Sequence, residues 1–439
     1  MNKMKRICAM AATLLLAAAT TQAAEPLKIF ILAGQSNMQG TAELRTLKGI
    51  GMDPETQKLA DKLLDKEGNP RVYEDVRIVY FDGKVDDPLI RHGELTAGFG
   101  ARTRAGDKTG LEFAFGATMY EKLKQPILII KTAWGGKDLY HDFRPPSAGP
   151  IFPDHSKVKP RKTNRGMMPA EEVIARAEKR EHVYYNAMVE HVNSVLADPG
   201  KYCPDYDKDA GYELAGFVWF QGFNDMLQGG MPFYQASEDQ PAFALYTELL
   251  ADLIRDLRKE FDAPKMPFVI GVIGISGDNV PPWKVGQLHL REAMAAPADM
   301  PEFKGNVVAV QTAPFWDTRI DEIHKVGSII KTPDHRRGNK PPYSEIDPEG
   351  KYAERHAKYQ AWYQAMMAAE PDKQTDRQAW RDWNRKLKAE MDSRVYSPEE
   401  LSYLEANQSN AGLHYWGSGK TYSQIGQAFA KAILEMNRK

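Results

Sequence analysis

The chain has 439 residues, of which 42% are hydrophobic, so it can bury a sizeable core. Its 58 basic and 59 acidic side chains give a formal net charge of −1. This balance excludes a general polyanion binder, because such a protein needs a large basic surface, although a local basic patch is compatible with it. We therefore expect a globular protein without a nucleic-acid partner.

The first residues have the pattern of a secretory signal peptide over residues 1–23. A basic start at residues 3–6 precedes an apolar run over residues 7–19, and small residues at Thr21 and Ala23 suit cleavage after Ala23. The apolar run is short for a membrane span, and an uncleaved signal anchor is the alternative. Cleavage would leave Cys203 as the one cysteine, so no intrachain disulfide could form. We expect an exported protein, periplasmic or secreted, with no stable membrane insertion after cleavage.

Short apolar runs alternate with longer helical patterns along the chain. The runs cover residues 27–33, 126–130, 214–220, 267–273 and 307–311, and the helical patterns cover residues 111–123, 170–198, 237–261, 284–297 and 422–437. Continuous apolar runs of this length are typical of strands buried on both faces, and the alternation predicts an α/β fold with a parallel sheet. Ligands bind at the carboxyl ends of the strands in such a sheet.

Two segments interrupt this alternation. Residues 139–168 are rich in Pro, Arg and Lys and are expected to form a long loop, whereas residues 335–412 are highly charged with helical spacing. The expected organisation is a signal peptide at 1–23, a main domain at 24–334, a helical insertion at 335–412 and a return of the main domain at 413–439.

Polar side chains and glycines follow three of the apolar runs, and a histidine precedes the last helix. Ser36 after the first run would lie on a strand-to-helix turn, where its own N–H could stabilise an oxyanion. Gly135 and Gly136 follow the second run and allow close approach of a ligand to the backbone, and Asn224 follows the third run and can donate from its amide. His414 supplies the base that a serine hydroxyl needs.

Each of these features has an ordinary structural explanation when it is considered alone. Ser36 could be a helix N-cap, the two glycines a turn, Asn224 a loop residue and His414 a structural histidine. Their occurrence together, at successive strand ends, favours a serine hydrolase.

The segment Ile31-Leu-Ala-Gly-Gln-Ser-Asn-Met38 resembles the opening block of the sialate O-acetylesterase-like domain, a branch of the SGNH/GDSL hydrolases that includes carbohydrate acetylesterases. Residues 131–136 and 219–225 resemble two further blocks of that family. The resemblance implies a flavodoxin-like three-layer α/β/α sandwich. It also implies that the protein hydrolyses acetyl esters on a sialate- or xylan-type saccharide. The partner would be an acetylated oligo- or polysaccharide, and the chemistry requires no metal and no cofactor.

The same resemblance implies roles for individual residues. Ser36 is the expected nucleophile and His414 the expected base. The expected oxyanion hole consists of the Ser36 N–H, a glycine N–H from Gly135 or Gly136, and Asn224. Three further side chains are expected to contact the substrate: Gln35, Gln221 and Trp134.

The chain departs from the family pattern where the orienting acid of the triad is expected. The usual Asp three residues before the histidine is Ala411 here, with Asn410 beside it, and Phe223 replaces a common acidic residue after Gln-Gly. Asp225 and, as the alternative, Asp317 both follow strands and are the candidates for the acid. A backbone carbonyl, which would leave a Ser–His dyad, is the third possibility.

Two other functions are compatible with the sequence. One is an esterase that acts on non-sugar esters, and the other is a carbohydrate-binding protein that has lost catalysis on an esterase scaffold. Five cations between residues 157 and 165 are either a solvated surface loop or a recognition element for an acidic or sulfated sugar.

Overall fold

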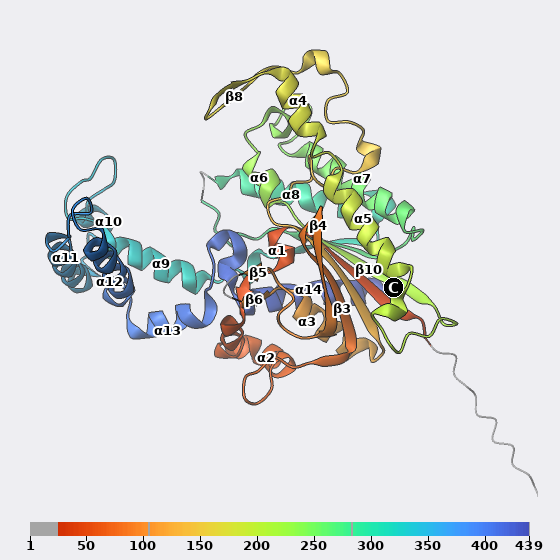
Figure 1. The fold of residues 1–439 in the computed structure, drawn as a ribbon, viewed down its shortest axis with the longest axis horizontal. Helices are drawn as coiled ribbons and strands as arrows, with labels where there is room; N and C mark the ends of the chain where they lie inside the picture. The colour runs from red at the N-terminus through yellow and green to blue at the C-terminus, as the bar shows by residue number, and fades with distance from the viewer. Residues whose placement is uncertain (1–24, 104–105, 282–283, 439) are drawn as a thin grey trace, which may run out of the picture.

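The computed structural model describes residues 25–103, 106–281 and 284–438. The predicted signal peptide at 1–23 lies outside these residues. A central seven-stranded sheet organises the structure, with strand order β12-β11-β10-β1-β7-β3-β4 (Figure 1). Helices cover both faces of this sheet, and this confirms the expected α/β class with three layers.

Five strands of the sheet correspond to the five apolar runs: β1 (Leu27–Gly34), β7 (Ile127–Ala133), β10 (Tyr212–Phe220), β11 (Phe268–Val272) and β12 (Val307–Gln311). They are parallel, as predicted. Strands β3 (Tyr73–Lys84) and β4 (Asp87–Leu95) were not predicted; they form an antiparallel hairpin at one edge. Most side chains of β4 are exposed or partly exposed, so this edge strand lacks a continuous apolar run.

Strand β1 lies at the point where the connections of the sheet change direction. Its neighbours are β7 on one side and β10 on the other, both parallel to it. Numbered along the chain, the six parallel strands lie in the order 2-3-1-4-5-6, whereas flavodoxin has the order 2-1-3-4-5. A crevice opens at such a reversal point outside the carboxyl ends of the strands, so ligand-binding groups are expected at the ends of β1, β7 and β10.

Two groups of helices sandwich the sheet. One face carries α3 (Glu112–Leu123) and α14 (Gly419–Met436), and the other carries α5 (Val183–Leu196), α7 (Ala244–Glu260) and α8 (Gly286–Ala295). Strand β10 shows the two faces directly. Gly216 lies against Ile433 of α14, whereas Trp219, three positions later, packs on Phe143, which contacts Tyr184 of α5. Because side chains of a strand alternate, these contacts lie on opposite faces.

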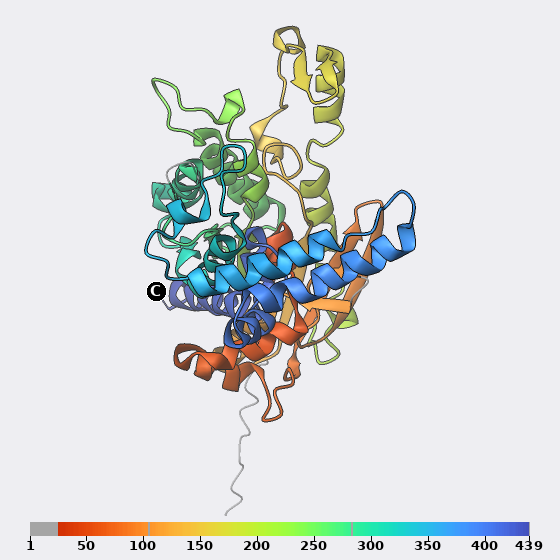
Figure 2. The same ribbon diagram turned by 90° about the vertical axis from the view of Figure 1, so that its left-hand side faces the viewer.

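A second apolar core lies beside the sandwich, in the part of the chain drawn at the left of Figure 1. It joins α9 (Thr318–Lys331), α11 (Ala353–Ala368), α12 (Arg377–Val395) and α13 (Pro398–Asn407), and α10 (Tyr343–Ile346) lies next to α9. Figure 2 shows α11 and α12 running side by side. We call α9 to α13 the helical subdomain. Its first helix precedes residue 335, and the domain boundaries given above stay a prediction.

The expected long loop at 139–168 contains more structure than predicted. Strands β8 (Arg161–Thr163) and β9 (Gly166–Met168) form a short antiparallel hairpin, followed by α4 (Ala170–Glu178). Together they project from the body of the molecule, at the top of Figure 1. Among the described residues, no helix is long and apolar enough to cross a membrane.

Gly34 ends β1 in a conformation that other residues disfavour. Its φ is 155°, and a Cβ at this position would lie 2.2 Å from the carbonyl oxygen of Phe220 on the neighbouring strand. The missing side chain therefore allows β1 and β10 to run close together up to the turn that carries Ser36.

We predict that Gly34→Ala lowers the free energy of unfolding by about 2 kcal/mol or more, because a backbone carbonyl of the sheet cannot move aside. Urea unfolding of the two proteins measures the difference. Gly286→Ala is the matched control, since a Cβ there has no neighbour within 4 Å and should leave stability unchanged or slightly raised. Equal stability of Gly34→Ala and the unmodified protein would contradict the close approach.

Candidate active site

Ser36 and His414 meet at the carboxyl end of the sheet although 378 positions separate them. Ser36 is the first residue of the short helix α1 (Ser36–Gln39), directly after β1, and His414 lies in the 3-10 segment Gly412–Gly417 before α14. The distance from Ser36 Oγ to His414 Nε2 is 3.1 Å. Both side chains are partly exposed, so an external molecule can reach them.

The segment that carries His414 has an unusual backbone. Tyr415, Trp416 and Gly417 are all left-handed, with φ of 48°, 61° and 59°. Such a conformation is costly for non-glycine residues and persists only where the surroundings hold it. The buried Tyr415 hydroxyl holds it here, because it lies 2.6 Å from both the Gly274 N–H and the Thr312 hydroxyl at the ends of the sheet.

Asn37 joins the serine turn to the histidine segment. Its Nδ2 donates to the Leu413 carbonyl at 3.2 Å, and its Oδ1 accepts from the Tyr422 hydroxyl at 3.1 Å. The side chain is buried, so these bonds lie in a protected environment. The sequence analysis did not assign this role to Asn37, whose place in the Gly-Gln-Ser-Asn-Met block is the only sequence signal for it.

The predicted oxyanion groups surround Ser36. A Cβ built on Gly135 would lie 3.6 Å from Ser36 Cβ, and one built on Gly136 would lie 4.0 Å from Asn224 Nδ2, so the exposed glycine pair lies beside both residues. Within residues 25–103, 106–281 and 284–438, no protein acceptor takes a hydrogen bond from the N–H of Ser36 or Gly135, or from Asn224 Nδ2. These donors are therefore available to an external oxygen atom.

Gln35 fixes the orientation of Asn224. Its Oε1 accepts from the Gly222 N–H at 3.1 Å, the Asn224 N–H at 3.4 Å and Gln221 Nε2 at 3.2 Å. Since these donors define the oxygen end of the Gln35 amide, its Nε2 faces Asn224 and donates to Oδ1 at 3.3 Å. Asn224 consequently keeps its Nδ2 free for another acceptor.

The structure corrects the expectation that three further side chains contact the substrate. Gln35, Gln221 and Trp134 are only 1%, 2% and 4% exposed. Gln35 and Gln221 are hydrogen-bonded to protein groups behind the site, and Trp134 packs on Phe143 and Tyr184 in the core. These buried residues support the turns that carry Ser36, the glycine pair and Asn224.

Asp225 is not the orienting acid. Its carboxylate is fully buried and accepts hydrogen bonds from the backbone of residues 139–140, from Gln221 Nε2 at 2.5 Å and from the Tyr234 hydroxyl at 2.5 Å. Burial raises the pKa of Asp225 to about 7. It contacts Gln221 instead of His414, and it holds the turn after β10 against the segment after β7.

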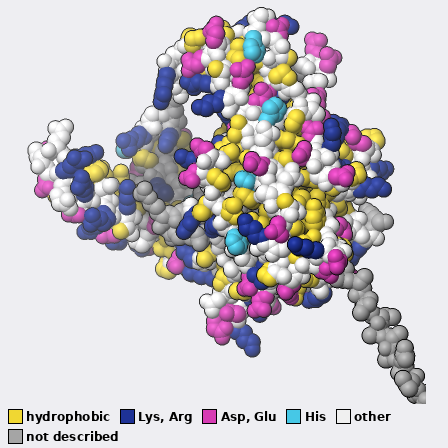
Figure 3. Space-filling view, turned by 45° about the vertical axis from the view of Figure 1, so that its right-hand side comes forward, with side chains coloured by type: hydrophobic (Ala, Val, Ile, Leu, Met, Phe, Trp, Pro, Cys, Tyr) yellow, Lys and Arg dark blue, Asp and Glu magenta, His cyan; other side chains and the backbone are white. Residues whose placement is uncertain are grey.

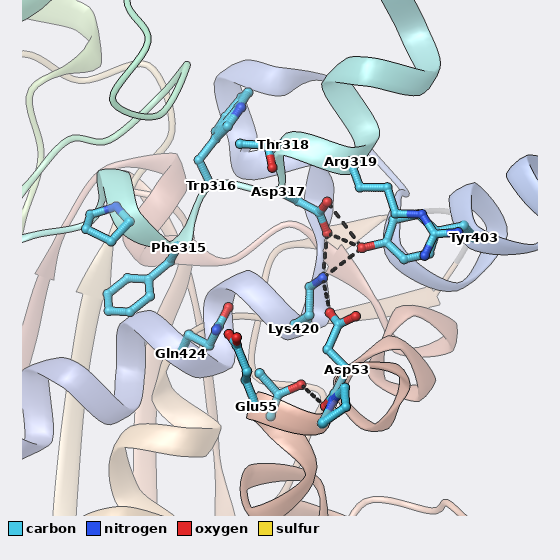
Figure 4. A pocket seen from close by; sticks show the side chains of 13 residues that line it. Asp53, Glu55, Phe315, Trp316, Asp317, Thr318, Arg319, Tyr403, Lys420 and Gln424 are labelled. Atoms are coloured by element: carbon cyan, nitrogen blue, oxygen red, sulfur yellow. Dashed lines mark hydrogen bonds and ion pairs between the residues drawn. The ribbon is translucent and has the colours of Figure 1, made fainter.

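Asp317 is not the orienting acid either. It caps α9 through the Ile320 N–H, and its carboxylate lies 2.7 Å from the Lys420 ammonium. Figure 4 shows Lys420 between Asp317 and Asp53, with the Tyr403 hydroxyl beside them. This cluster lines a pocket of about 410 Å³ and links the helical subdomain to α14, but neither Ser36 nor His414 lines that pocket.

Asn410 occupies the place of the missing acid. His414 Nδ1 lies 3.2 Å from Asn410 Oδ1, and the same oxygen accepts from the Ala411 N–H at 2.8 Å. The oxygen that accepts from the Ala411 N–H is also the atom of the amide that faces His414 Nδ1. Nδ1 then carries the proton and Nε2 is left free to accept one from Ser36, as a catalytic base requires.

The neutral amide leaves His414 without a partner charge. Burial, reinforced by the positive charge of Lys108, lowers the pKa of His414 below its ordinary value of 6.5. The imidazole is therefore uncharged at neutral pH. In the described residues, no group of three or more His, Cys, Asp or Glu side chains is arranged to hold a metal ion.

We predict that Asn410→Asp raises the pKa of His414 by about one unit or more, because a carboxylate next to Nδ1 favours the imidazolium. An NMR titration of the imidazole ring signals measures this pKa directly. Asn437→Asp, at an exposed position at the end of α14, is the control for an added negative charge and should leave the pKa of His414 unchanged. An unchanged pKa in Asn410→Asp would show that residue 410 does not face the ring.

Comparison with known proteins places the chain in a family. Residues 26–313 match the family described as "SASA: Carbohydrate esterase, sialic acid-specific acetylesterase". No curated protein matches the chain. It is similar to a solved structure of a protein from Arabidopsis thaliana, with 18% identity, 65% of this chain and 86% of that chain covered, and a TM-score of 0.35.

A second similar structure is a carbohydrate acetylesterase from Xanthomonas citri, with 15% identity, 65% of this chain and 49% of that chain covered, and a TM-score of 0.35. The family match spans more than half of the 439 residues. The chain belongs to the sialic acid-specific acetylesterase family of carbohydrate esterases.

Proposed function

We propose that this protein is a serine-dependent O-acetylesterase that removes acetyl groups from a saccharide, with Ser36 as nucleophile and His414 as base. The observation that carries the proposal is the 3.1 Å contact between Ser36 Oγ and His414 Nε2, next to three unoccupied hydrogen-bond donors. A serine hydroxyl is a weak nucleophile unless a base accepts its proton, and this contact supplies that base.

The reaction proceeds in two halves. His414 takes the hydroxyl proton while Ser36 attacks the acetyl carbonyl carbon, and the resulting oxyanion is held by the Ser36 N–H, the Gly135 N–H and Asn224 Nδ2. His414 then returns the proton to the leaving sugar hydroxyl, which leaves an acetyl group on Ser36. Water, activated by His414, releases acetate by the same route and restores the enzyme.

The lowered pKa of His414 sets the expected pH dependence. The neutral imidazole is the active form, so kcat/KM falls when His414 becomes protonated. Because the pKa of His414 lies below 6.5, activity is expected to persist at mildly acidic pH. It should decline only as the pH falls through the pKa of His414.

The family supports a saccharide ester as substrate, and the surroundings of Ser36 agree with it. The glycine pair at 135–136 is exposed and has no side chain, so the backbone donors stand open to a bulky molecule. An acetyl group is small enough to reach them while the saccharide stays outside. The proposal also includes export of the protein and an acetylated oligo- or polysaccharide as its binding partner.

Ser36→Ala should lower kcat for an aryl acetate by several orders of magnitude, because the residual site lacks the nucleophile. Stopped-assay or spectrophotometric rates on the purified variant test this, and circular dichroism establishes that the variant is folded. Ser423→Ala, a buried serine of α14, is a control for loss of a hydroxyl and should keep nearly full activity. Near-full turnover by folded Ser36→Ala would disprove the proposal.

Asn224→Ala should lower kcat about 100-fold or more, with a smaller effect on KM, since the amide stabilises charge that develops only in the transition state. Steady-state kinetics on the same ester separates the two parameters. Asn193→Ala on the outer side of α5 serves as control. A KM effect without a kcat effect would assign Asn224 to substrate binding and remove it from the oxyanion hole.

A further inference from the structure

A group of exposed cations projects from the same edge of the sheet as the active site. Residues 157–168 contain five basic side chains and no acidic one, in a chain whose formal net charge is −1. The five are Lys157, Lys159, Arg161, Lys162 and Arg165, and all are exposed. We call residues 157–168 the basic hairpin, because β8 and β9 lie within it.

Most of these charges have no counter-charge in the protein. Lys157 pairs with Asp154 at 3.2 Å. Within the part of the chain that the structure describes, the other four make no ion pair, although acidic side chains are as numerous as basic ones in the chain as a whole. Cations gathered within a few residues repel one another, and a bound anion would relieve this repulsion.

The basic hairpin is a formed element and not a free loop. Three ladder positions pair β8 with β9, and the Thr163 side chain accepts from the Arg165 N–H and donates to the Gly166 carbonyl at the turn. Because successive side chains of a strand point to opposite sides, Arg161 and Lys162 present charge on both sides of the ribbon. The backbone that carries Arg161, Lys162 and Arg165 is therefore ordered before a ligand binds.

The segment is attached to the elements that form the active site. The chain that leads to the basic hairpin leaves the site after Gly136. Where it returns after α4, Arg180 Nη2 lies 2.7 Å from Asp138 Oδ2. Asp138 Oδ2 also accepts from Gln228 Nε2 at 2.8 Å, next to α6 (Phe223–Leu227), the helix that carries Asn224. These bonds orient the projection relative to the oxyanion donors.

A second contact connects the basic hairpin itself to the site. Arg161 Nη2 lies 3.6 Å from the sulfur of Met231, in the loop that follows α6. Strand β8 lies at the top of the molecule in Figure 1. Dark blue Lys and Arg side chains stand at the upper left in the turned view of Figure 3. The basic hairpin is therefore linked through Met231 to the segment that follows α6, the helix that carries Asn224.

We propose that the basic hairpin is an accessory binding site for an anionic polysaccharide, one that carries carboxylate or sulfate groups along the same chain whose acetyl ester enters the active site. This inference rests on the proposed function and narrows its substrate class. Arg and Lys bind these groups through charge-assisted hydrogen bonds, Arg in a bidentate manner. Different parts of one polymer chain would occupy the active site and the basic hairpin, so the gain is expected for polymers.

Binding without hydrolysis tests the site separately from catalysis. The Ser36→Ala protein should bind polygalacturonate and dextran sulfate in isothermal titration at 50 mM NaCl, and binding of neutral arabinoxylan should be weaker. Lys159→Gln, Lys162→Gln and Arg165→Gln, combined in that protein, should weaken anionic binding by about tenfold or more. Arg161 is kept because it anchors the hairpin through Met231.

Three exposed cations of α12 provide the matched control. Arg381→Gln, Arg385→Gln and Lys388→Gln remove the same charge from the helical subdomain and should leave binding unchanged. Raising NaCl to 500 mM should abolish the difference between the hairpin variant and its parent, since exposed charges are screened. Polygalacturonate and dextran sulfate together show whether carboxylate or sulfate is preferred.

Kinetics then connects the two sites. On acetylated pectate, the triple hairpin variant with Ser36 intact should show a KM raised about tenfold, an unchanged kcat, and no change on an aryl acetate. Equal binding by the hairpin variant and its parent would overturn the inference, as would equal losses in both triple variants. Hairpin-dependent binding of a single-stranded oligonucleotide or of anionic vesicles, without binding of polygalacturonate or dextran sulfate, would overturn it as well.

Failure of this inference and failure of the proposed function give different results. If the Ser36→Ala protein binds the polymer but the unmodified protein hydrolyses no ester, the proposed function fails and the accessory site stands. If the unmodified protein deacetylates neutral xylan and no anionic polymer binds, the proposed function stands and the accessory site fails.

Discussion

The hydrogen bond between Ser36 Oγ and His414 Nε2 is the interaction on which the site depends. Three consecutive residues form this bond and position the groups around it. Ser36 supplies the hydroxyl, Gln35 on one side orients Asn224, and Asn37 on the other side holds the histidine segment. The two amide side chains are buried, so their hydrogen bonds persist without competition from water. One short turn after β1 therefore coordinates groups from the middle and the end of the chain.

The histidine is held without a carboxylate. Asn410 orients the ring through an oxygen that also accepts from the Ala411 N–H, whereas a carboxylate would add charge stabilisation of the imidazolium. Losing that stabilisation weakens the base, but it also keeps His414 unprotonated to lower pH. The geometry is that which the proposed proton transfer needs, while the electrostatics differ from those of an acid-containing triad.

The helical subdomain contributes to this arrangement from outside the sandwich. Trp416, two residues after His414, stacks on His324 of α9. The His324 ring bonds Gln408, whose amide donates to the Asn410 carbonyl. The Lys420 cluster of Figure 4 joins the same two units. The helical subdomain therefore supports the segment that carries Asn410 and His414.

Much of the sandwich could be predicted because buried parallel strands leave continuous apolar runs, and Ser36, Gly135, Asn224 and His414 follow or precede such elements. The contact of Asn410 with the His414 ring could not be predicted, because it depends on a local fold in which the Trp416 carbonyl accepts from the N–H groups of Ser409 and Asn410. The burial of Gln35, Gln221 and Trp134 was also hidden, since a sequence does not show which side of a strand end is open to solvent.

The most direct test of the central claim is to map where a fluorophosphonate probe attaches. Mass spectrometry of the digested, labelled protein should find the adduct on the peptide that contains Ser36, and His414→Ala should abolish it because the hydroxyl then lacks its base. Hydrolysis of acetyl esters by a protein whose Ser36 stays unlabelled, or a label carried by another serine, would contradict the account.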